Sequence, residues 1–300
     1  MQAIKDEQPI LYRQLHNSLK HGTLLHAYLF EGEDLFQLNE WATWAMCGFF
    51  CLEPKDGDPC LKCLNCRRIQ ENEHPDVLHI APVGNTIKVE QIRLLQQEFG
   101  KSGMETKKRG FIISSGEKMS VSAANSLLKF LEEPQEDTLA IFTTTALGQI
   151  LPTIQSRLSI LHLRPLKKDR LREKLTENTL TKKNADVLSY LTDSFTKAVE
   201  MSEEAWFNDA VGEVENFVGK LSAHNWESFI LVQTKLANLK EKKQQETCFE
   251  MIFYFLKKSQ LPPKEKGELL SIFLEQKRKF QSNVSFQNAL EQGVIQAQVR

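Results

Sequence analysis

Long apolar runs and an excess of charge are both missing from this sequence of 300 residues. The longest apolar run in the C-terminal half is residues 251–256, far short of the roughly 20 residues of a membrane-spanning helix, so we expect no membrane partner. Lysine plus arginine number 38 and aspartate plus glutamate 39, a formal net charge of −1 that argues against nucleic-acid binding by the whole surface. The first residues show neither the basic flank nor the apolar segment of a secretory signal, so we expect a cytoplasmic protein.

What is present is an ordinary globular composition, with 41% hydrophobic and 26% charged residues. One core rarely serves more than about 250–300 residues, so we expect two or three domains. Over residues 1–165, short apolar segments alternate with helical patterns, which predicts an α/β domain with a parallel sheet covered on both faces. The predicted strands are 26–30, 77–80, 110–114, 139–143 and 159–163, and the predicted helices are 9–20, 35–50, 89–99 and the segment between Ser120, as its N-cap, and Pro134.

The strand pattern ends after residue 165. Residues 166–205 are charged and helical, whereas residues 206–300 are helical with many more large apolar side chains. The sequence therefore predicts three parts, namely an α/β domain, a small helical domain and a larger helical domain.

The cysteines are unevenly distributed, and five of the six lie between Cys47 and Cys66. Cys60, Cys63 and Cys66 form a C-x-x-C-x-x-C motif, and Cys51 precedes it across a polar loop. In a reducing compartment this spacing predicts a tetrahedral, structural Zn²⁺ site with these four thiolates as ligands. Cys47 lies one helical turn before Cys51, so either of them fits as the outer ligand. A set of buried free thiols or an adventitious disulfide is the alternative.

The segment after the first predicted strand is where a nucleotide-binding α/β protein carries its glycine-rich loop. On the template G-x-x-x-x-G-K-[ST], Gly32 matches, but the last three positions are Gln37, Leu38 and Asn39. A lysine for the phosphates and a hydroxyl for Mg²⁺ are therefore missing. The third predicted strand also ends in two serines, at 114–115, where an ATPase needs an acidic residue. We expect no productive ATP site; an unrelated α/β domain that never bound phosphate is the alternative.

Four segments together resemble the delta-prime family of bacterial DNA polymerase III clamp-loader subunits. They are HAYLF at 26–30, the C-x8-C-x2-C-x2-C set, AANSLLKFLEEP at 123–134 and ILPTIQSRL at 150–158. The resemblance covers roughly residues 1–165. It implies an AAA+ fold, with a RecA-like α/β domain that carries a zinc module at about 47–70, a helical lid over 166–205 and a helical collar for oligomerisation over 206–300.

The resemblance also implies a role and partners. ATP hydrolysis in such assemblies belongs to the gamma/tau subunits, so the residues at 37–39 favour a delta-prime type that is no enzyme as an isolated chain. Such a chain is a subunit of the DNA polymerase III holoenzyme, where it supports ATP-driven loading of the sliding clamp onto primed DNA. The implied partners are gamma/tau and delta subunits and, through the assembly, the sliding clamp and primer–template DNA.

One arginine stands out once the resemblance is considered. The segment Ser156-Arg157-Leu158 resembles the Ser-Arg-Cys motif of the family, with leucine in place of cysteine. This implies that Arg157, with Ser156 beside it, reaches the ATP site of an adjacent subunit as an arginine finger. A guanidinium delivered there would stabilise the charge that develops on the transferred phosphoryl group. Without the resemblance, the commoner interpretation is a surface arginine paired with a nearby carboxylate.

Two other functions stay open at the level of the sequence. The first is an ATP-hydrolysing motor of the gamma/tau type, which binding and turnover of ATP would support. The second is a zinc-dependent DNA-binding protein on an α/β scaffold, which tight and strongly salt-dependent DNA binding by the isolated chain would support.

Overall fold

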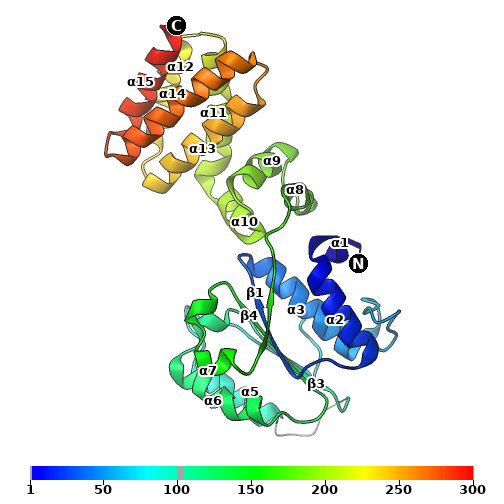
Figure 1. Ribbon diagram of the computed structural model, residues 1–300. Helices are drawn as coiled ribbons and strands as arrows, with labels where there is room; N and C mark the ends of the chain where they lie inside the picture. Colours follow the sequence, from blue (N-terminus) through cyan, green and yellow to red (C-terminus); the bar gives the residue numbers. More distant parts are fainter. Residues whose placement is uncertain (1, 100–104, 300) are drawn as a thin grey trace. The chain divides into compact units, whose positions relative to one another are not determined.

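The structure, a computed structural model, describes residues 2–99 and 105–299 (Figure 1). The chain divides into two compact units, residues 1–166 and 167–300. The finer division into three domains, with a boundary near 205 inside the second unit, stays a prediction.

The first unit is built on one sheet of five parallel strands in the order β2-β3-β4-β1-β5. Strand β1 lies between β4 and β5, with Tyr28 opposite Ile141 on one side and Ser159 on the other. The strands are β1 (Ala27–Glu31), β2 (Val77–Ile80), β3 (Arg109–Ile113), β4 (Thr138–Thr144) and β5 (Ser159–His162). The predicted parallel sheet is confirmed, and all five strands lie within one or two residues of their predicted positions.

Helices cover both faces of this sheet, because successive side chains of each strand enter two different apolar clusters. Tyr28 and Phe30 of β1 pack with Trp41 of α3 (Leu35–Phe50) in one cluster, and Leu29 packs with Leu127 of α6 (Val121–Glu132) in the other. The helical elements of this unit are α1 (Gln2–Glu7), α2 (Pro9–His21), α3 (Leu35–Phe50), α4 (Leu64–Gln70), α5 (Val89–Phe99), η1 (Gly116–Lys118), α6 (Val121–Glu132), η2 (Leu147–Gln149) and α7 (Pro152–Gln155).

Local sequence signals set the ends of these helices. Pro9 opens α2, and Gly22 ends it with a φ of 64°, a left-handed conformation that favours glycine. Ser120 accepts a hydrogen bond from the N–H of Ala123 at 3.2 Å and caps α6 as predicted. The short helices α1 and α4 escape prediction from the sequence, because six or seven residues are too few to show a helical period.

The second unit is helical throughout its described part. Its core contains pairs of aromatic rings in contact, such as Phe217 with Phe273 and Phe249 with Phe280. The elements are α8 (Lys168–Glu177), α9 (Lys182–Leu191), α10 (Phe195–Glu203), α11 (Ala205–Ser222), α12 (Glu227–Thr234), η3 (Leu236–Asn238), α13 (Lys242–Lys258), α14 (Pro263–Gln281) and α15 (Phe286–Gln298). The predicted order, a parallel-sheet unit followed by helices, is confirmed. Among the described helices, none combines the length and apolar character needed to cross a bilayer.

Candidate metal centre and sheet edge

Four thiols converge where α3 ends and α4 begins. Cys51 is the C-cap of α3, Cys60 lies in the connecting loop, Cys63 is the N-cap of α4 and Cys66 lies in its first turn. Their sulfur atoms all lie within 4.8 Å of one another. A tetrahedral Zn²⁺ with Zn–S bonds of about 2.3 Å needs sulfur atoms about 3.8 Å apart, so small side-chain rotations complete the geometry.

Backbone N–H groups point at these sulfur atoms. The N–H of Cys60 donates to Cys51 Sγ at 3.3 Å, and the N–H of Cys63 donates to Cys60 Sγ at 3.2 Å. Hydrogen bonds from the backbone of Lys62 and Cys63 lower the pKa of Cys60 to about 6, which favours the thiolate that binds metals. Burial raises the pKa of Cys51 to about 12, and a bound cation would reverse that shift because it stabilises the thiolate.

Cys47 lies outside this group. It is fully buried inside α3, and its thiol donates to the carbonyl oxygen of Cys66 at 3.6 Å. The geometry therefore selects Cys51 as the outer member of the set. Four sulfur donors with this spacing fit Zn²⁺ in a closed site, the type that stabilises folds and leaves no position for a substrate.

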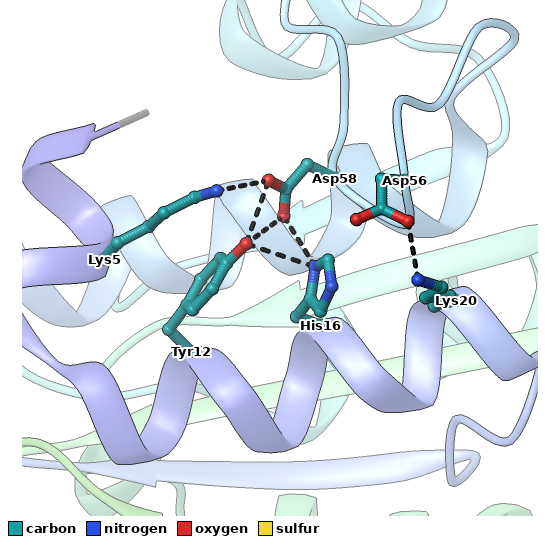
Figure 2. A network of polar contacts seen from close by, with 6 residues as sticks. All are labelled: Lys5, Tyr12, His16, Lys20, Asp56 and Asp58. Atoms are coloured by element: carbon teal, nitrogen blue, oxygen red, sulfur yellow. Dashed lines mark hydrogen bonds and ion pairs between the residues drawn. The ribbon is translucent and has the colours of Figure 1, made fainter.

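The loop between Cys51 and Cys60 is attached to the N-terminal helices by a buried carboxylate (Figure 2). Asp58 is 6% exposed and accepts a hydrogen bond from the Tyr12 hydroxyl at 2.8 Å. Its oxygens also lie 3.0 Å from His16 Nδ1 and 3.0 Å from Lys5 Nζ. Although burial acts to raise the pKa of Asp58, hydrogen bonds from these three side chains lower it below its ordinary value.

The same face of α2 carries a second contact to this loop. Tyr12, His16 and Lys20 are four residues apart and therefore lie along one stripe of the helix. Lys20 pairs with Asp56 at 2.6 Å (Figure 2). Gly57 has a φ of 91°, and a Cβ there would lie 2.7 Å from the Cβ of Lys20, so the loop backbone packs directly against the helix. Sequence patterns did not reveal this network, although the spacing of four was visible.

The segment aligned with the phosphate loop is short and closed by apolar side chains. β1 ends at residue 31 and α3 begins at residue 35, so three residues connect them. Gln37, Leu38 and Asn39 all lie in the first turns of α3, and Leu38 is fully buried in the apolar cluster. A Cβ on Gly32 would lie 3.2 Å from the Cβ of Leu163. Apolar side chains thus pack where a phosphate loop needs a cation and open backbone N–H groups.

Polar side chains at the carboxyl edge of the sheet bind one another. Ser114 donates from Oγ to Asn39 Oδ1 at 3.1 Å, and the N–H of Ser115 donates to Thr143 Oγ1 at 3.3 Å. The hydroxyl oxygen of Thr144 accepts from the N–H of Ala146 at 3.1 Å in the same way. These hydroxyls therefore satisfy neighbouring groups of the chain itself.

Arg157 follows Ser156, the C-cap of α7, and its side chain is 31% exposed. Its Nε donates to Glu132 Oε1 at 3.0 Å, and its Nη1 donates to the carbonyl oxygen of Thr153 and to Ser156 Oγ. The structure thus brings Arg157 and Ser156 together and adds Glu132, which sequence patterns did not single out. Glu132 lies in the AANSLLKFLEEP segment, and its place in that motif was the one feature of the sequence that could have indicated it.

Comparison with known proteins places this chain among replication proteins. The family model described as DNA polymerase III, delta subunit, matches residues 7–167. The DNA polymerase III subunit delta' of Bacillus subtilis is 33% identical over 97% of this chain and 96% of its own length. The delta' subunit of Pseudomonas aeruginosa is 30% identical over 50% of this chain and 45% of its own length. The tau/gamma subunit of Haemophilus influenzae is 31% identical over 57% of this chain and 24% of its own length.

The extent of these matches separates the two kinds of relative. The Bacillus delta' subunit is matched along nearly its whole length, whereas the tau/gamma subunit extends far beyond the matched region. The resemblance found in the sequence motifs is confirmed. This chain belongs to the DNA polymerase III delta subunit family, and it is similar along nearly its whole length to the delta' subunit of Bacillus subtilis.

Proposed function

We propose that this chain is a non-hydrolysing subunit of a clamp loader, which supports ATP-driven loading of a sliding clamp onto primed DNA. The observation that carries the proposal is the 33% identity with a delta' subunit over 97% of the chain. The buried Leu38 supports the non-hydrolysing part, because an ATPase needs a lysine that can reach the phosphates at that position.

The neighbours of this subunit in the assembly are gamma/tau and delta subunits, and sliding clamp and primer–template DNA are reached through the assembly. The place of action is then the cytoplasm. Residues 166–205 serve as a lid and residues 206–300 as a collar that binds neighbouring subunits. The large apolar side chains of α11, α13 and α14 support a collar that is rigid enough to hold subunits in place.

Arg157 has the chemistry for a contribution to hydrolysis in a neighbouring subunit. Its guanidinium carries a permanent positive charge, is partly exposed and follows a short helix in the segment that resembles Ser-Arg-Cys. Placed at a neighbour's ATP, it stabilises the charge that develops on the transferred phosphoryl group. Ser156 contributes indirectly, since its Oγ accepts a hydrogen bond from Arg157 Nη1 at 3.3 Å.

Zn²⁺ has a structural role in this proposal. Bound to Cys51, Cys60, Cys63 and Cys66, it supplies a cross-link between the end of α3 and the start of α4. The loop from 52 to 59 is then fixed at both ends, and Asp58 holds α1 and α2 against it.

The test is co-purification with gamma/tau and delta chains, followed by ATPase assays with and without this chain. We expect a stable complex whose clamp- and DNA-stimulated ATPase requires this chain and falls in Arg157→Ala, while the isolated chain hydrolyses no ATP. ATP turnover by the isolated chain would instead support a gamma/tau-type motor. Tight, salt-dependent DNA binding by the isolated chain would support a zinc-dependent DNA-binding protein.

A further inference from the structure

The guanidinium of Arg157 is largely occupied by its own chain. Nε donates to Glu132 Oε1 at 3.0 Å, and Nη2 donates to the same oxygen. Nη1 donates to the carbonyl oxygen of Thr153 at 2.7 Å and to Ser156 Oγ at 3.3 Å. A guanidinium carries five N–H donors, so these four bonds within the described chain leave one donor for another ligand. Arg157 therefore has to exchange partners before it can bind a phosphate fully.

The backbone around this pair is held in place. Glu132 is the last residue of α6, and Arg157 follows α7. The two helices are tied together because Leu131 and Ile154 are buried in the same apolar cluster. Movement of the Arg157 side chain alone can break the pair, without any change in the fold.

The ion pair with Glu132 reduces the positive charge that Arg157 presents to a neighbouring subunit. An arginine finger acts through its positive charge, and a carboxylate in contact with the guanidinium cancels most of that charge. The side chains of Arg157 and Glu132 are 31% and 49% exposed. Exposed ion pairs of this kind shift an equilibrium by about 1.5- to 5-fold, so a triphosphate can displace the carboxylate.

We propose that Glu132 is a positioning residue that holds Arg157 in a stowed conformation and so restrains ATP hydrolysis in the neighbouring subunit. This inference rests on the proposed role of Arg157 in trans. In the free chain the carboxylate satisfies the guanidinium. In the assembly a neighbour's triphosphate competes with Glu132 for it, and Arg157 is fully effective after it has left Glu132.

The experiment uses the full chain, reconstituted at saturating concentrations with gamma/tau and delta subunits, without clamp or DNA. Glu132→Gln keeps the size of the side chain and removes its charge. Glu133→Gln is the matched control, because Glu133 is the adjacent exposed carboxylate at the end of α6. Arg157→Ala and the double variant complete the set, and thermal unfolding of each isolated chain checks the fold.

We expect Glu132→Gln to raise kcat for ATP by about two- to five-fold with little change in KM, because the finger acts in the transition state. Glu133→Gln should leave the rate unchanged, and the double variant should match Arg157→Ala. If the rate of Glu132→Gln is unchanged or lower while Arg157→Ala is impaired, the restraint by Glu132 is refuted, but the role of Arg157 as an arginine finger is not. A rise that persists in the double variant also refutes it, since Glu132 then acts without Arg157. No loss in Arg157→Ala in this assay refutes the restraint, and no loss in the clamp- and DNA-stimulated assay overturns the finger as well.

Discussion

The hydroxyl of Tyr12 donates a hydrogen bond of 2.8 Å to Asp58 and so joins α2 to the loop that carries the cysteines. Asp58 is buried, and Lys5 and His16 complete its shell of partners. The N-terminal helices and the candidate zinc site are therefore parts of one structural unit, although the cysteines lie about thirty residues or more further along the chain.

Asp58→Asn is expected to lower the free energy of unfolding of the isolated chain by about 1.5–3 kcal/mol, the usual range for hydrogen bonds to a charged group. The neutral amide forms no ion pair with Lys5 and replaces one of the two acceptor oxygens with a donor, so the network loses an acceptor. Urea unfolding monitored by circular dichroism measures the change. Asp56→Asn is the control, since this carboxylate is 77% exposed and its removal should change nothing measurable. Equal effects of the two variants would contradict the role assigned to Asp58.

The contribution of Asp58 should depend on pH in a defined direction. Its pKa in the folded chain lies below its ordinary value of 3.8, so the unfolded chain takes up a proton first as the pH falls. The stability that Asp58 provides is thus complete above about pH 4–5 and is lost as the pH falls through its folded pKa. Urea midpoints at pH 7, 5 and 3 should show a difference between the parent and Asp58→Asn that is equal at pH 7 and 5 and smaller at pH 3. A difference that grows toward acid pH would show that the sign is wrong.

Metal analysis distinguishes Cys51 from Cys47 as a ligand. The purified chain should contain about one equivalent of zinc under reducing conditions, because four thiolates form a closed structural site. Cys47→Ser should retain the metal, whereas Cys51→Ser should retain about half an equivalent or less. Atomic absorption and titration with a chromogenic chelator give the content and the affinity. Loss of zinc from Cys47→Ser with retention in Cys51→Ser would reverse the assignment.

Restoring a lysine at position 38 should not create an ATP site. Leu38 is fully buried, so Leu38→Lys places an unpaired charge in the core and should destabilise the chain by roughly 3 kcal/mol or more. Leu38→Met, which conserves volume, should cost less than about 1.5 kcal/mol. Urea unfolding and calorimetric titration with Mg-ATP test this. A stable Leu38→Lys variant that binds ATP would contradict the closed geometry described for this segment.

Much of the first unit follows from local patterns in the sequence. Helix α3 has its predicted bounds, because an apolar helical pattern runs unbroken from 35 to 50. The strands are short apolar segments that a buried parallel sheet requires. The sequence did not decide whether Cys47 or Cys51 is the outer metal ligand, because the two cysteines are one helical turn apart. It depends on where α3 ends, since a cysteine inside the helix points into the core and the next one beyond its end is free to join the loop.

The sequence also did not predict which side chains pair across long distances in the chain. Glu132 meets Arg157 across 25 positions, and Asp58 meets Tyr12 across 46. Such pairs depend on how helices and loops pack, which periodicity along one element does not encode. For that reason the sequence identified Arg157 as a candidate through a motif and left its resting partner unknown.

The stripe of Tyr12, His16 and Lys20 has a consequence for cells that are short of zinc. These three side chains are synthesised before the loop whose carboxylates they contact, so the contacts form only after the cysteine loop has folded, which in the proposed function requires Zn²⁺. A nascent subunit made without zinc would lack these polar contacts and hold its N-terminal helices less firmly, which would expose them more often to proteases. The supply of this replication subunit would then follow the zinc status of the cell through degradation, with no change in transcription.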